Sequence, residues 1–341
     1  MRRTPTGPTA PQAHRRTGAQ GVRAGEVPDP EVGADDVPVR IRAASINPLD
    51  RMIRDGEMKT ILPYRVPFVL GNDLAGIVVE VGSAVTDFAV GDEVFARPDK
   101  DRIGTFAELI AVHRDDLAIK PATLTMEEAA SLPLVALTSW QVLVERAHVQ
   151  PGQKVLVHAG SGGLGTVAIQ LAKQLGAHVA TTTSTANVHL VKRLGADVVV
   201  DYKKQAFETV LHDYDVVLDS LGGETLEKSL DVLKPGGQVI SVAGPPDAAL
   251  GRELGANPVV RLVMSALSFR IRRRARRRNV SYSFLFMKAS GDQLRKLTPL
   301  IEAGTIRPVV DTVFPFESTR EALEYVEAGR AKAGKVVVKM P

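Results

Sequence analysis

The segment from Lys154 to Gly176 restricts the possible folds of this chain more than any other. A short apolar run, Val155–Val157, leads directly into glycines spaced as Gly-x-Gly-x-x-Gly, and a helical pattern of apolar residues follows. Glycines permit a tight turn and a close approach to a pyrophosphate, whose charge the free N–H groups at the helix N-terminus receive. This order of strand, turn and helix predicts a dinucleotide site. The alternative is a tight turn without a ligand.

The predicted dinucleotide site continues into the strand that follows, His178–Thr183. This strand ends in hydroxyl and amide residues, without the Asp or Glu that would bond the ribose 2′-OH of NAD. Hydroxyls and an amide tolerate a 2′-phosphate, so the sequence favours NADPH over NADH, although Ser184 or Thr185 could instead cap the next helix. From these two segments we expect cofactor contacts by Gly160, Ser161, Gly162, Gly163, Leu164, Gly165, Thr183, Ser184 and Asn187.

Composition excludes several other classes of protein. The 341 residues contain no cysteine, which excludes disulfides, thiolate catalysis and cysteine-bound zinc, and the histidines show no shared metal-ligand spacing. No window holds 18 consecutive apolar residues, so we expect a cytoplasmic protein without a transmembrane helix. The net charge of +4 comes from arginines clustered in residues 2–16 and 270–278. The remainder is acidic, which argues against a general nucleic-acid surface.

Seven of the nine residues 270–278 are arginine, and they follow an amphipathic apolar stretch that begins at Val259. Such a segment could bind anionic lipid or the phosphate tail of a substrate. The simpler interpretation is a helix end that faces water, because the charges are predicted to spread around the helix. No stable insertion into a membrane is expected.

The order of elements predicts an α/β fold with two domains. Alternating strands at 37–44, 76–81, 93–96 and 106–112 indicate a β-rich domain, and Thr125 begins a capped helix. Six strands then alternate with helices, which predicts a doubly wound parallel sheet in the order 3-2-1-4-5-6. These strands are expected at 154–158, 178–183, 197–201, 214–219, 237–243 and 281–287. Helices near 292–303 and 318–328 and a strand at 335–339 close the chain.

A set of further motifs lies in a fixed order along the chain. They are Ala44–Asp50, Leu70–Gly76, Val81-Gly82, Val90–Val94, Gly104–Glu108, Leu137–Trp140, Gly195–Asp197, Asp215–Gly223 and Gly334–Val338. With the glycine loop, they resemble the zinc-independent, quinone oxidoreductase-like branch of the medium-chain dehydrogenase/reductase superfamily. The resemblance implies a GroES-like domain at 22–124, a Rossmann NADP-binding domain at 125–291, and a segment, 292–341, that returns to the first domain. Residues 1–21 supply no apolar first strand and are interpreted as a disordered or misassigned leader.

Zinc-dependent relatives carry Cys where this chain has Ile46-Asn47, and Gly-His-Glu where it has Gly71-Asn72-Asp73. The chain therefore predicts no metal. The resemblance implies that Asn47 and Asp50 line the substrate cleft, with turn and cap roles as the alternative. Tyr64 could donate a proton, but a packed tyrosine is favoured. Cofactor contacts are implied for Thr138, Tyr202, Ser220, Leu221, Val242, Ala243, Gly244, Phe284, Phe286 and Lys335.

These features together predict an NADPH-dependent reductase that transfers a hydride to quinones or α,β-unsaturated carbonyl compounds. An enoyl-thioester reductase and a non-catalytic NADPH-binding protein are the alternatives. The resemblance also implies a homodimer through the sixth strand, where Tyr282, Phe284 and Phe286 alternate as a candidate apolar face.

Overall fold

The computed structural model describes residues 9–13, 21–59, 62 and 64–341, and for residues 9–13 it describes the backbone alone. The contacts divide the chain into two compact units. The first unit comprises residues 1–137 and 288–341, and the second comprises residues 138–287.

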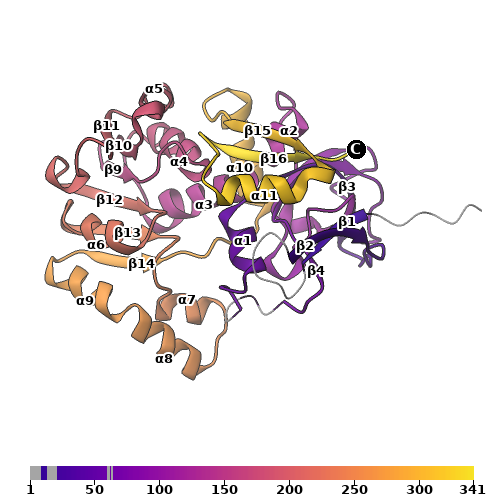
Figure 1. Ribbon diagram of the computed structural model, residues 1–341, viewed down its shortest axis with the longest axis horizontal. Helices are drawn as coiled ribbons and strands as arrows, with labels where there is room; N and C mark the ends of the chain where they lie inside the picture. Colours follow the sequence, from indigo (N-terminus) through magenta and orange to yellow (C-terminus); the bar gives the residue numbers. More distant parts are fainter. Residues whose placement is uncertain (1–8, 14–20, 60–61, 63) are drawn as a thin grey trace, which may run out of the picture. The chain divides into compact units, whose positions relative to one another are not determined.

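The first unit is built on a mainly antiparallel sheet with the order β15-β16-β3-β5-β6-β8, in which β7 also pairs with β3 (Figure 1). Its strands are β3 (Asp36–Ile46), β5 (Asp73–Val78), β6 (Glu93–Ala96), β7 (Leu109–His113), β8 (Leu117–Ile119), β15 (Val310–Pro315) and β16 (Lys335–Lys339). The long strand β3 pairs with β5, β7 and β16, so it brings the end of the chain beside residues 43–46.

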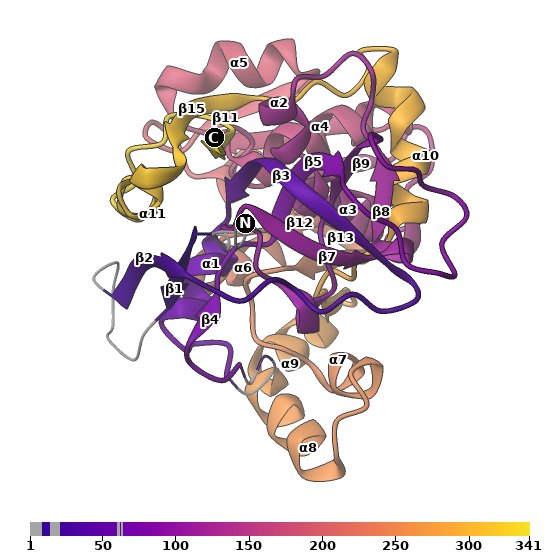
Figure 2. The same ribbon diagram turned by 90° about the vertical axis from the view of Figure 1, so that its right-hand side faces the viewer.

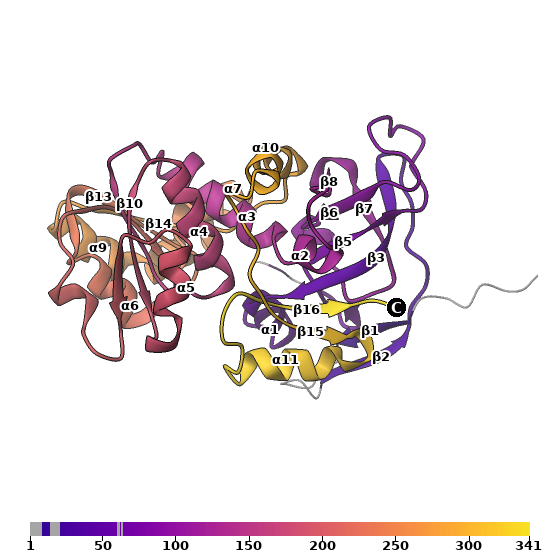
Figure 3. The same ribbon diagram turned by 90° about the horizontal axis from the view of Figure 1, so that it is seen from above.

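This unit also contains helices. They are α1 (Pro48–Arg54), α2 (Met126–Ala130), the start of α3 (Pro133–Trp140), α10 (Gly291–Glu302) and α11 (Thr319–Glu327). Those predicted near 292–303 and 318–328 agree with α10 and α11 to within a few residues. Thr125 caps α2 through a capping box with Glu128, as the sequence predicts. Figure 3 shows α11 along β15 and β16. The predicted domains divide at 124/125 and 291/292, but α2 packs on β3 and β5 and so belongs to the first unit.

A second, small sheet has the order β2-β1-β4, made of β1 (Thr9–Ala13), β2 (Val22–Glu26) and β4 (Phe68–Val69) (Figure 2). Strand β1 pairs antiparallel with both neighbours. Residues 9–13 thus form a strand within the segment interpreted from the sequence as a disordered or misassigned leader, although this strand is not apolar. Backbone hydrogen bonds from two flanking strands support this segment without an apolar pattern, so periodicity did not reveal it. The rest of the predicted leader lies outside the described residues.

The second unit contains a six-stranded, wholly parallel sheet with the order β11-β10-β9-β12-β13-β14. Its strands are β9 (Lys154–Val157), β10 (His178–Thr183), β11 (Val198–Asp201), β12 (Tyr214–Asp219), β13 (Leu233–Ser241) and β14 (Ser281–Phe284). The predicted doubly wound order 3-2-1-4-5-6 is confirmed. Its central strands carry continuous apolar residues because both faces of a parallel sheet are covered, and the side chains of Val155–Val157 are fully buried.

The helices of this unit are α4 (Gly163–Gln174), α5 (Val188–Arg193), α6 (Gly223–Ser229), α7 (Ala248–Glu253), α8 (Pro258–Leu267) and α9 (Phe269–Arg277). A π-helical turn, Gln141–Arg146, continues α3. Helices α7, α8 and α9 gather at one end of the unit, away from α5 (Figure 2). Within the described part of the chain, every helix is too short or too polar to cross a bilayer.

Candidate active site

The glycine loop joins β9 to α4, and its three motif glycines have different steric surroundings. A Cβ added at Gly160 would lie 2.0 Å from the Thr181 Oγ1, and one at Gly165 would lie 2.4 Å from the Ala159 carbonyl oxygen. The close packing around these two positions is by itself enough to require glycine. A Cβ at Gly162 would meet only the Ala159 oxygen, at 3.3 Å, so the protein leaves space there. Gly162 is the N-cap of α4 without a capping side chain, and this open, N–H-rich position fits a pyrophosphate.

The predicted hydroxyl and amide residues converge beside this loop. The Ser161 hydroxyl accepts hydrogen bonds from the Thr183 hydroxyl and from the Asn187 amide, both at 3.1 Å. Ser184 makes no capping bond through its side chain, which removes the alternative role for this residue. Tyr202 follows β11 with 60% of its surface exposed, and its N–H donates to the Thr183 carbonyl. The structure thus brings together Ser161, Thr183 and Asn187.

Asp219 and Ser241 organise the two strand ends that carry the remaining predicted contacts. The buried Asp219 carboxylate accepts from the backbone N–H groups of Leu221 and Gly222 and from the Ser241 hydroxyl, at 2.6 Å. The Ser241 oxygen in turn accepts from the Ala243 and Gly244 N–H groups. The segments Ser220-Leu221 and Val242–Gly244 are therefore held in place by one pair of side chains. Asp219 lies in the motif Asp215–Gly223, from which no separate role for this side chain was predicted.

Other predicted cofactor residues occupy less open positions. Thr138 is almost fully buried in α3, and Phe284 is buried at the end of β14, whereas Phe286 is half-buried. Their predicted contacts with the cofactor remain predictions. Tyr282 is buried too, and its hydroxyl donates to the Pro245 carbonyl, so the alternating aromatic face of β14 is partly covered by this chain itself.

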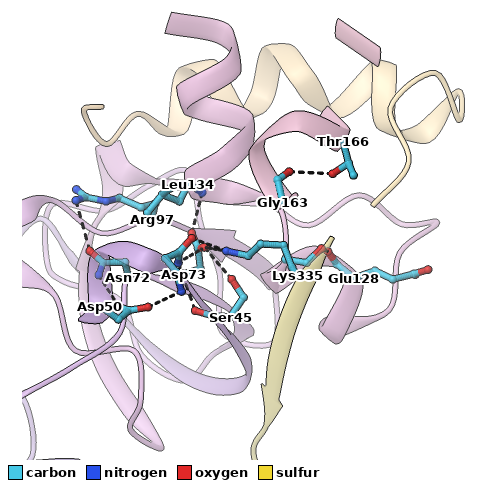
Figure 4. A network of polar contacts seen from close by, with 12 residues as sticks. Ser45, Asp50, Asn72, Asp73, Arg97, Glu128, Leu134, Gly163, Thr166 and Lys335 are labelled. Carbon is cyan, nitrogen blue, oxygen red and sulfur yellow. Dashed lines mark hydrogen bonds and ion pairs between the residues drawn. The ribbon is translucent and has the colours of Figure 1, made fainter. Parts of the chain in front are cut away.

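A buried polar network lies in the first unit, where α1 begins (Figure 4). Asn47 is the N-cap of α1, Pro48 is its first residue, and Asp50 accepts from the Asn47 N–H at 2.7 Å. This is the cap arrangement that the sequence analysis held as the alternative. The second Asp50 oxygen accepts from the Asn72 amide, also at 2.7 Å, so this carboxylate joins α1 to the residue that precedes β5.

Asp73 is the centre of the network. One carboxylate oxygen accepts from the Ser45 hydroxyl at 2.8 Å, the Asn47 amide at 2.9 Å and the Lys335 ammonium at 3.3 Å. The other oxygen accepts from the Leu134 N–H at 2.7 Å, at the start of α3, where the helix dipole favours an anion. Lys335 also donates to the side-chain oxygen (Oδ1) of Asn47. The network therefore links three strands and two helices.

Lys335 reaches this position because of the residue before it. Gly334 has φ +73, and a Cβ there would lie 2.0 Å from the Val309 carbonyl oxygen. Only glycine allows this close approach, after which β16 starts and carries Lys335 into the interior. The structure places the ammonium group among Asn47 and Asp73, and the implied contact with a cofactor remains a prediction.

Burial controls the charges of this network. Desolvation raises the pKa of Asp50 to about 6, against the hydrogen bonds from Asn47 and Asn72, and it lowers the pKa of Lys335. The Lys335 ammonium lies 3.3 Å from the Asp73 carboxylate, and this cation offsets its negative charge without a metal.

Arg97 follows β6 and is 1% exposed. Its Nη2 lies 3.5 Å from the Asn72 carbonyl oxygen, whereas its Nε and Nη1 have no hydrogen-bond partner among the described residues. Buried polar groups without partners are rare because they cost free energy. Among the described residues, these two nitrogens therefore lack an acceptor. The sequence analysis missed Arg97, although an arginine directly after the apolar strand Val94–Ala96 was a visible signal.

Tyr64 packs its ring on Phe68, with ring centres 5.2 Å apart, and its hydroxyl donates to the Lys100 carbonyl oxygen. Burial raises the pKa of this hydroxyl. The contacts favour the packing role. Asn47 also borders a cavity of about 170 Å³ whose other lining residues are Ile46, Pro48, Arg51, Leu323, Val326 and Glu327.

Two family models match the chain. Residues 33–122 match the alcohol dehydrogenase GroES-like domain, and residues 194–338 match a zinc-binding dehydrogenase model. The chain is 37% identical to the chloroplastic NADPH-dependent alkenal/one oxidoreductase of Arabidopsis thaliana, over 91% of this chain and 73% of that protein. The chain belongs to the medium-chain dehydrogenase/reductase superfamily.

Solved structures of this superfamily have the same fold. The quinone oxidoreductase of Coxiella burnetii is 29% identical with a TM-score of 0.85, covering 98% of this chain and 99% of that chain. The quinone oxidoreductase of Escherichia coli, solved in complex with NADPH, is 26% identical with a TM-score of 0.78, covering 97% of this chain and 99% of that chain.

The residues of this superfamily member do not fit the zinc ion that one family model is named for. The Asn72 amide donates to Asp50. The Asp73 carboxylate already accepts hydrogen bonds from three side chains and from the Leu134 N–H at the start of α3. Within the described ranges, no group of three His, Asp or Glu side chains could hold a metal ion. The Lys335 ammonium is the cation that Asp73 binds.

Proposed function

We propose that this protein is an NADPH-dependent reductase that transfers a hydride to the C=C bond of quinones or α,β-unsaturated carbonyl compounds. The observation that carries the proposal is the pairing of Asp73 with Lys335 where zinc-dependent relatives would bind metal. Without a Lewis acid on the substrate oxygen, hydrogen bonds must polarise the carbonyl, which suits an activated C=C bond better than a simple alcohol. The Arabidopsis relative, named for NADPH and alkenals, supports the same chemistry.

The second unit would hold the cofactor. The open position at Gly162 would receive the pyrophosphate, and the group of Ser161, Thr183 and Asn187 would surround the 2′-phosphate. The bound NADPH supplies the hydride from its nicotinamide ring. Asp219 and Ser241 are positioning residues, because they orient the backbone of the segments at 220–222 and 242–244 without themselves being exposed.

One negatively charged residue, Asp201, lies at the end of the strand next to β10 and would repel the proposed 2′-phosphate. Asp201 ends β11 and accepts from the Thr185 hydroxyl at 2.6 Å, and the Thr185 hydroxyl and the Lys203 N–H lower the pKa of this carboxyl. Lys204 lies 3.6 Å from the same carboxylate. These hydrogen bonds keep Asp201 negatively charged, and the Lys204 ammonium is the neighbour that offsets this charge near the proposed 2′-phosphate, because Asn187 supplies no charge of its own.

The first unit would hold the acceptor. Two buried nitrogens of Arg97, Nε and Nη1, have no acceptor among the described residues, and a substrate carbonyl oxygen is a suitable one. Asn47 borders the cavity and is held rigidly by Asp73 and Lys335. Because the Tyr64 proton is already donated to the Lys100 carbonyl, water is the favoured source of the proton that completes the reduction.

The test is NADPH oxidation with a benzoquinone, a naphthoquinone, an enal, an enone and an enoyl-CoA, each repeated with NADH. We expect turnover with NADPH and much less with NADH. A preference for enoyl-CoA would favour the enoyl-thioester reductase instead. NADPH binding without turnover on every acceptor would overturn the proposal in favour of a binding protein.

A charge variant tests the cofactor preference. Ser184→Asp places a carboxylate beside the proposed 2′-phosphate, and repulsion is expected to weaken NADPH binding by about tenfold. NADH binding is expected to change little. Equal effects on both cofactors would contradict the proposed location of the 2′-phosphate.

Two finer features are also proposed. In the described part of the chain, β14 has a strand neighbour on one side only, so its free backbone edge could pair with a second copy in a homodimer. Light scattering on the protein and on a Ser283→Pro variant would test this. A cytoplasmic location is proposed as well, and cell fractionation would test it.

A further inference from the structure

The helices between β13 and β14 expose apolar side chains on one face. The apolar face of α8 consists of Val259, Leu262, Val263 and Leu267, which are 51% to 71% exposed. Their spacing of three, four and eight residues puts them on one side of the helix. Phe269, at the start of α9, is 56% exposed. Isolated apolar residues are common on protein surfaces, but a continuous face of this kind indicates a partner.

The helix that carries this face is well formed without a partner. Asn257 caps α8 by accepting from the Val260 N–H at 3.0 Å, and Pro258 is its first residue. Its inner side, with Met264 buried, packs on α7. The apolar face of α8 is therefore turned away from the rest of its own unit.

Six of the seven arginines at 270–278 divide into two groups, and the seventh, Arg272, lies 3.5 Å from the Ser265 hydroxyl. Arg274 pairs with Glu227 at 2.6 Å and with Asp231 at 3.2 Å, and Arg270 and Arg278 pair with the same two acids on or beside α6. The basic face of α9 consists of Arg273, Arg276 and Arg277, which are exposed and have no ion-pair partner in the described ranges. The arginines lie on more than one side of the helix, as predicted, and acids on or beside α6 engage three of them.

The two faces lie along one helical rod. Backbone hydrogen bonds continue across Ser268, whose N–H donates to Met264 and whose carbonyl accepts from Arg272. Ile271 and Ala275 are buried on the side of α9 that packs on β14. The spacing places Phe269 and the basic face of α9 on the opposite side, which is also the side of the apolar face of α8. Figure 1 shows α8 and α9 in succession at the edge of the second unit.

We propose that this rod binds the surface of a bilayer that contains anionic lipid. The apolar face of α8 would enter the boundary between headgroups and acyl chains, and the basic face of α9 would contact lipid phosphates. Guanidinium groups suit phosphate because they form paired, charge-assisted hydrogen bonds. A second copy of this chain fits less well, since the same patch would meet itself across a two-fold axis and bring arginines together. The proposal does not depend on the reductase activity.

The experiment is sedimentation of the full-length protein with vesicles of phosphatidylcholine alone, or of phosphatidylcholine that contains phosphatidylglycerol. We expect binding to the anionic vesicles only, and weaker binding as salt is raised from about 0.05 M to about 0.5 M. Arg276→Gln/Arg277→Gln is expected to weaken binding by about thirtyfold, at roughly one factor of five per charge. Leu262→Ser/Val263→Ser is expected to weaken it by tenfold or more.

The matched control is Lys192→Gln/Arg193→Gln, which removes the same charge from the end of α5. It is expected to bind vesicles like the unchanged protein, and the thermal midpoint of each variant reports whether it folds. No binding to anionic vesicles at low salt would overturn the proposal. An equal loss with the control pair would also overturn it, because the effect would then be one of net charge. Conversion of an oligomer to a monomer by Leu262→Ser/Val263→Ser, without vesicle binding by the unchanged protein, would identify the face as a protein interface instead.

Discussion

The pairing of Lys335 with Asp73 makes a quantitative prediction about stability. Lys335→Met keeps the length of the side chain and removes its charge, which leaves the fully buried Asp73 carboxylate without its cation. Loss of one partner of a buried ion pair costs about 3–5 kcal/mol. Asp73 retains hydrogen bonds from Ser45, Asn47 and the Leu134 N–H, so we expect the lower end, about 3 kcal/mol.

The assay is urea unfolding of the two single variants, Lys335→Met and Asp73→Asn, and of the double variant. Each single variant leaves one buried group uncompensated, whereas the double variant leaves neither. The double variant should therefore lose about 2 kcal/mol less than the sum of the single losses. Lys339→Met is the matched control on the same strand. Lys339 is 63% exposed in its pair with Glu127, and its loss should cost less than about 1 kcal/mol. Additive losses at Lys335 and Asp73, within about 0.5 kcal/mol, would refute the ion pair as the reason for the burial.

Three further predictions concern both units. Gly162→Ala should leave the free energy of unfolding nearly unchanged and weaken NADPH binding by about tenfold, whereas Gly165→Ala should cost about 1–3 kcal/mol of stability because its Cβ would lie 2.4 Å from the Ala159 oxygen. Fluorescence titration and urea unfolding measure the two quantities, and equal effects of the two variants would contradict the separate roles. Burial lowers the pKa of His158 from 6.5 to about 4, so its contribution to stability is complete above pH 6.5 and about 3 kcal/mol is lost as the pH falls to about 4. Asp50 acts in the opposite direction, because its raised pKa makes stability fall as pH rises from 3.8 to about 6. The contribution of His158 is therefore measured as the difference in the free energy of unfolding between the unchanged protein and His158→Gln, from urea unfolding at each pH. If the stability of the unchanged protein and that of His158→Gln had the same pH dependence, the assignment of the acid-induced loss to His158 would be contradicted. Arg97→Met should lower kcat/KM for an enone by about tenfold to a hundredfold through loss of a charged hydrogen bond, without loss of stability. Unchanged kcat/KM in steady-state kinetics would show that Arg97 does not contact the acceptor.

The hydrogen bonds and the protonation state of the His158 ring could not be predicted from the sequence. Its Nε2 lies 2.9 Å from the Ser229 hydroxyl, which donates to the Thr225 carbonyl, so Nε2 must carry the proton. Its Nδ1 then accepts from the Thr182 hydroxyl at 3.1 Å. The two partners lie on different elements, Ser229 at the end of α6 and Thr182 in β10. Nothing in the spacing of the histidines predicts this neutral, fully bonded ring.

The glycine loop shows the opposite case. The strand, the three glycines and the helix are consecutive, so their pattern predicted the loop, its helix and the hydroxyl residues that end β10. The parallel sheet order was predictable as well, because strands that alternate with helices pack in few ways. Strand β1 escaped prediction because its hydrogen bonds come from β2 and β4 and do not require apolar side chains.

The sequence by itself determined the fold, the cofactor loop and the absence of cysteine chemistry, because each depends on residues that are near one another in the chain or on composition. Only the tertiary structure decided that Asn47, Asp73 and Lys335 form one buried network, that two nitrogens of Arg97 lack partners among the described residues, and that three arginines of the segment 270–278 are already paired. These facts depend on contacts between residues up to 288 positions apart, and the burial that gives them their energies exists only when the strands are assembled.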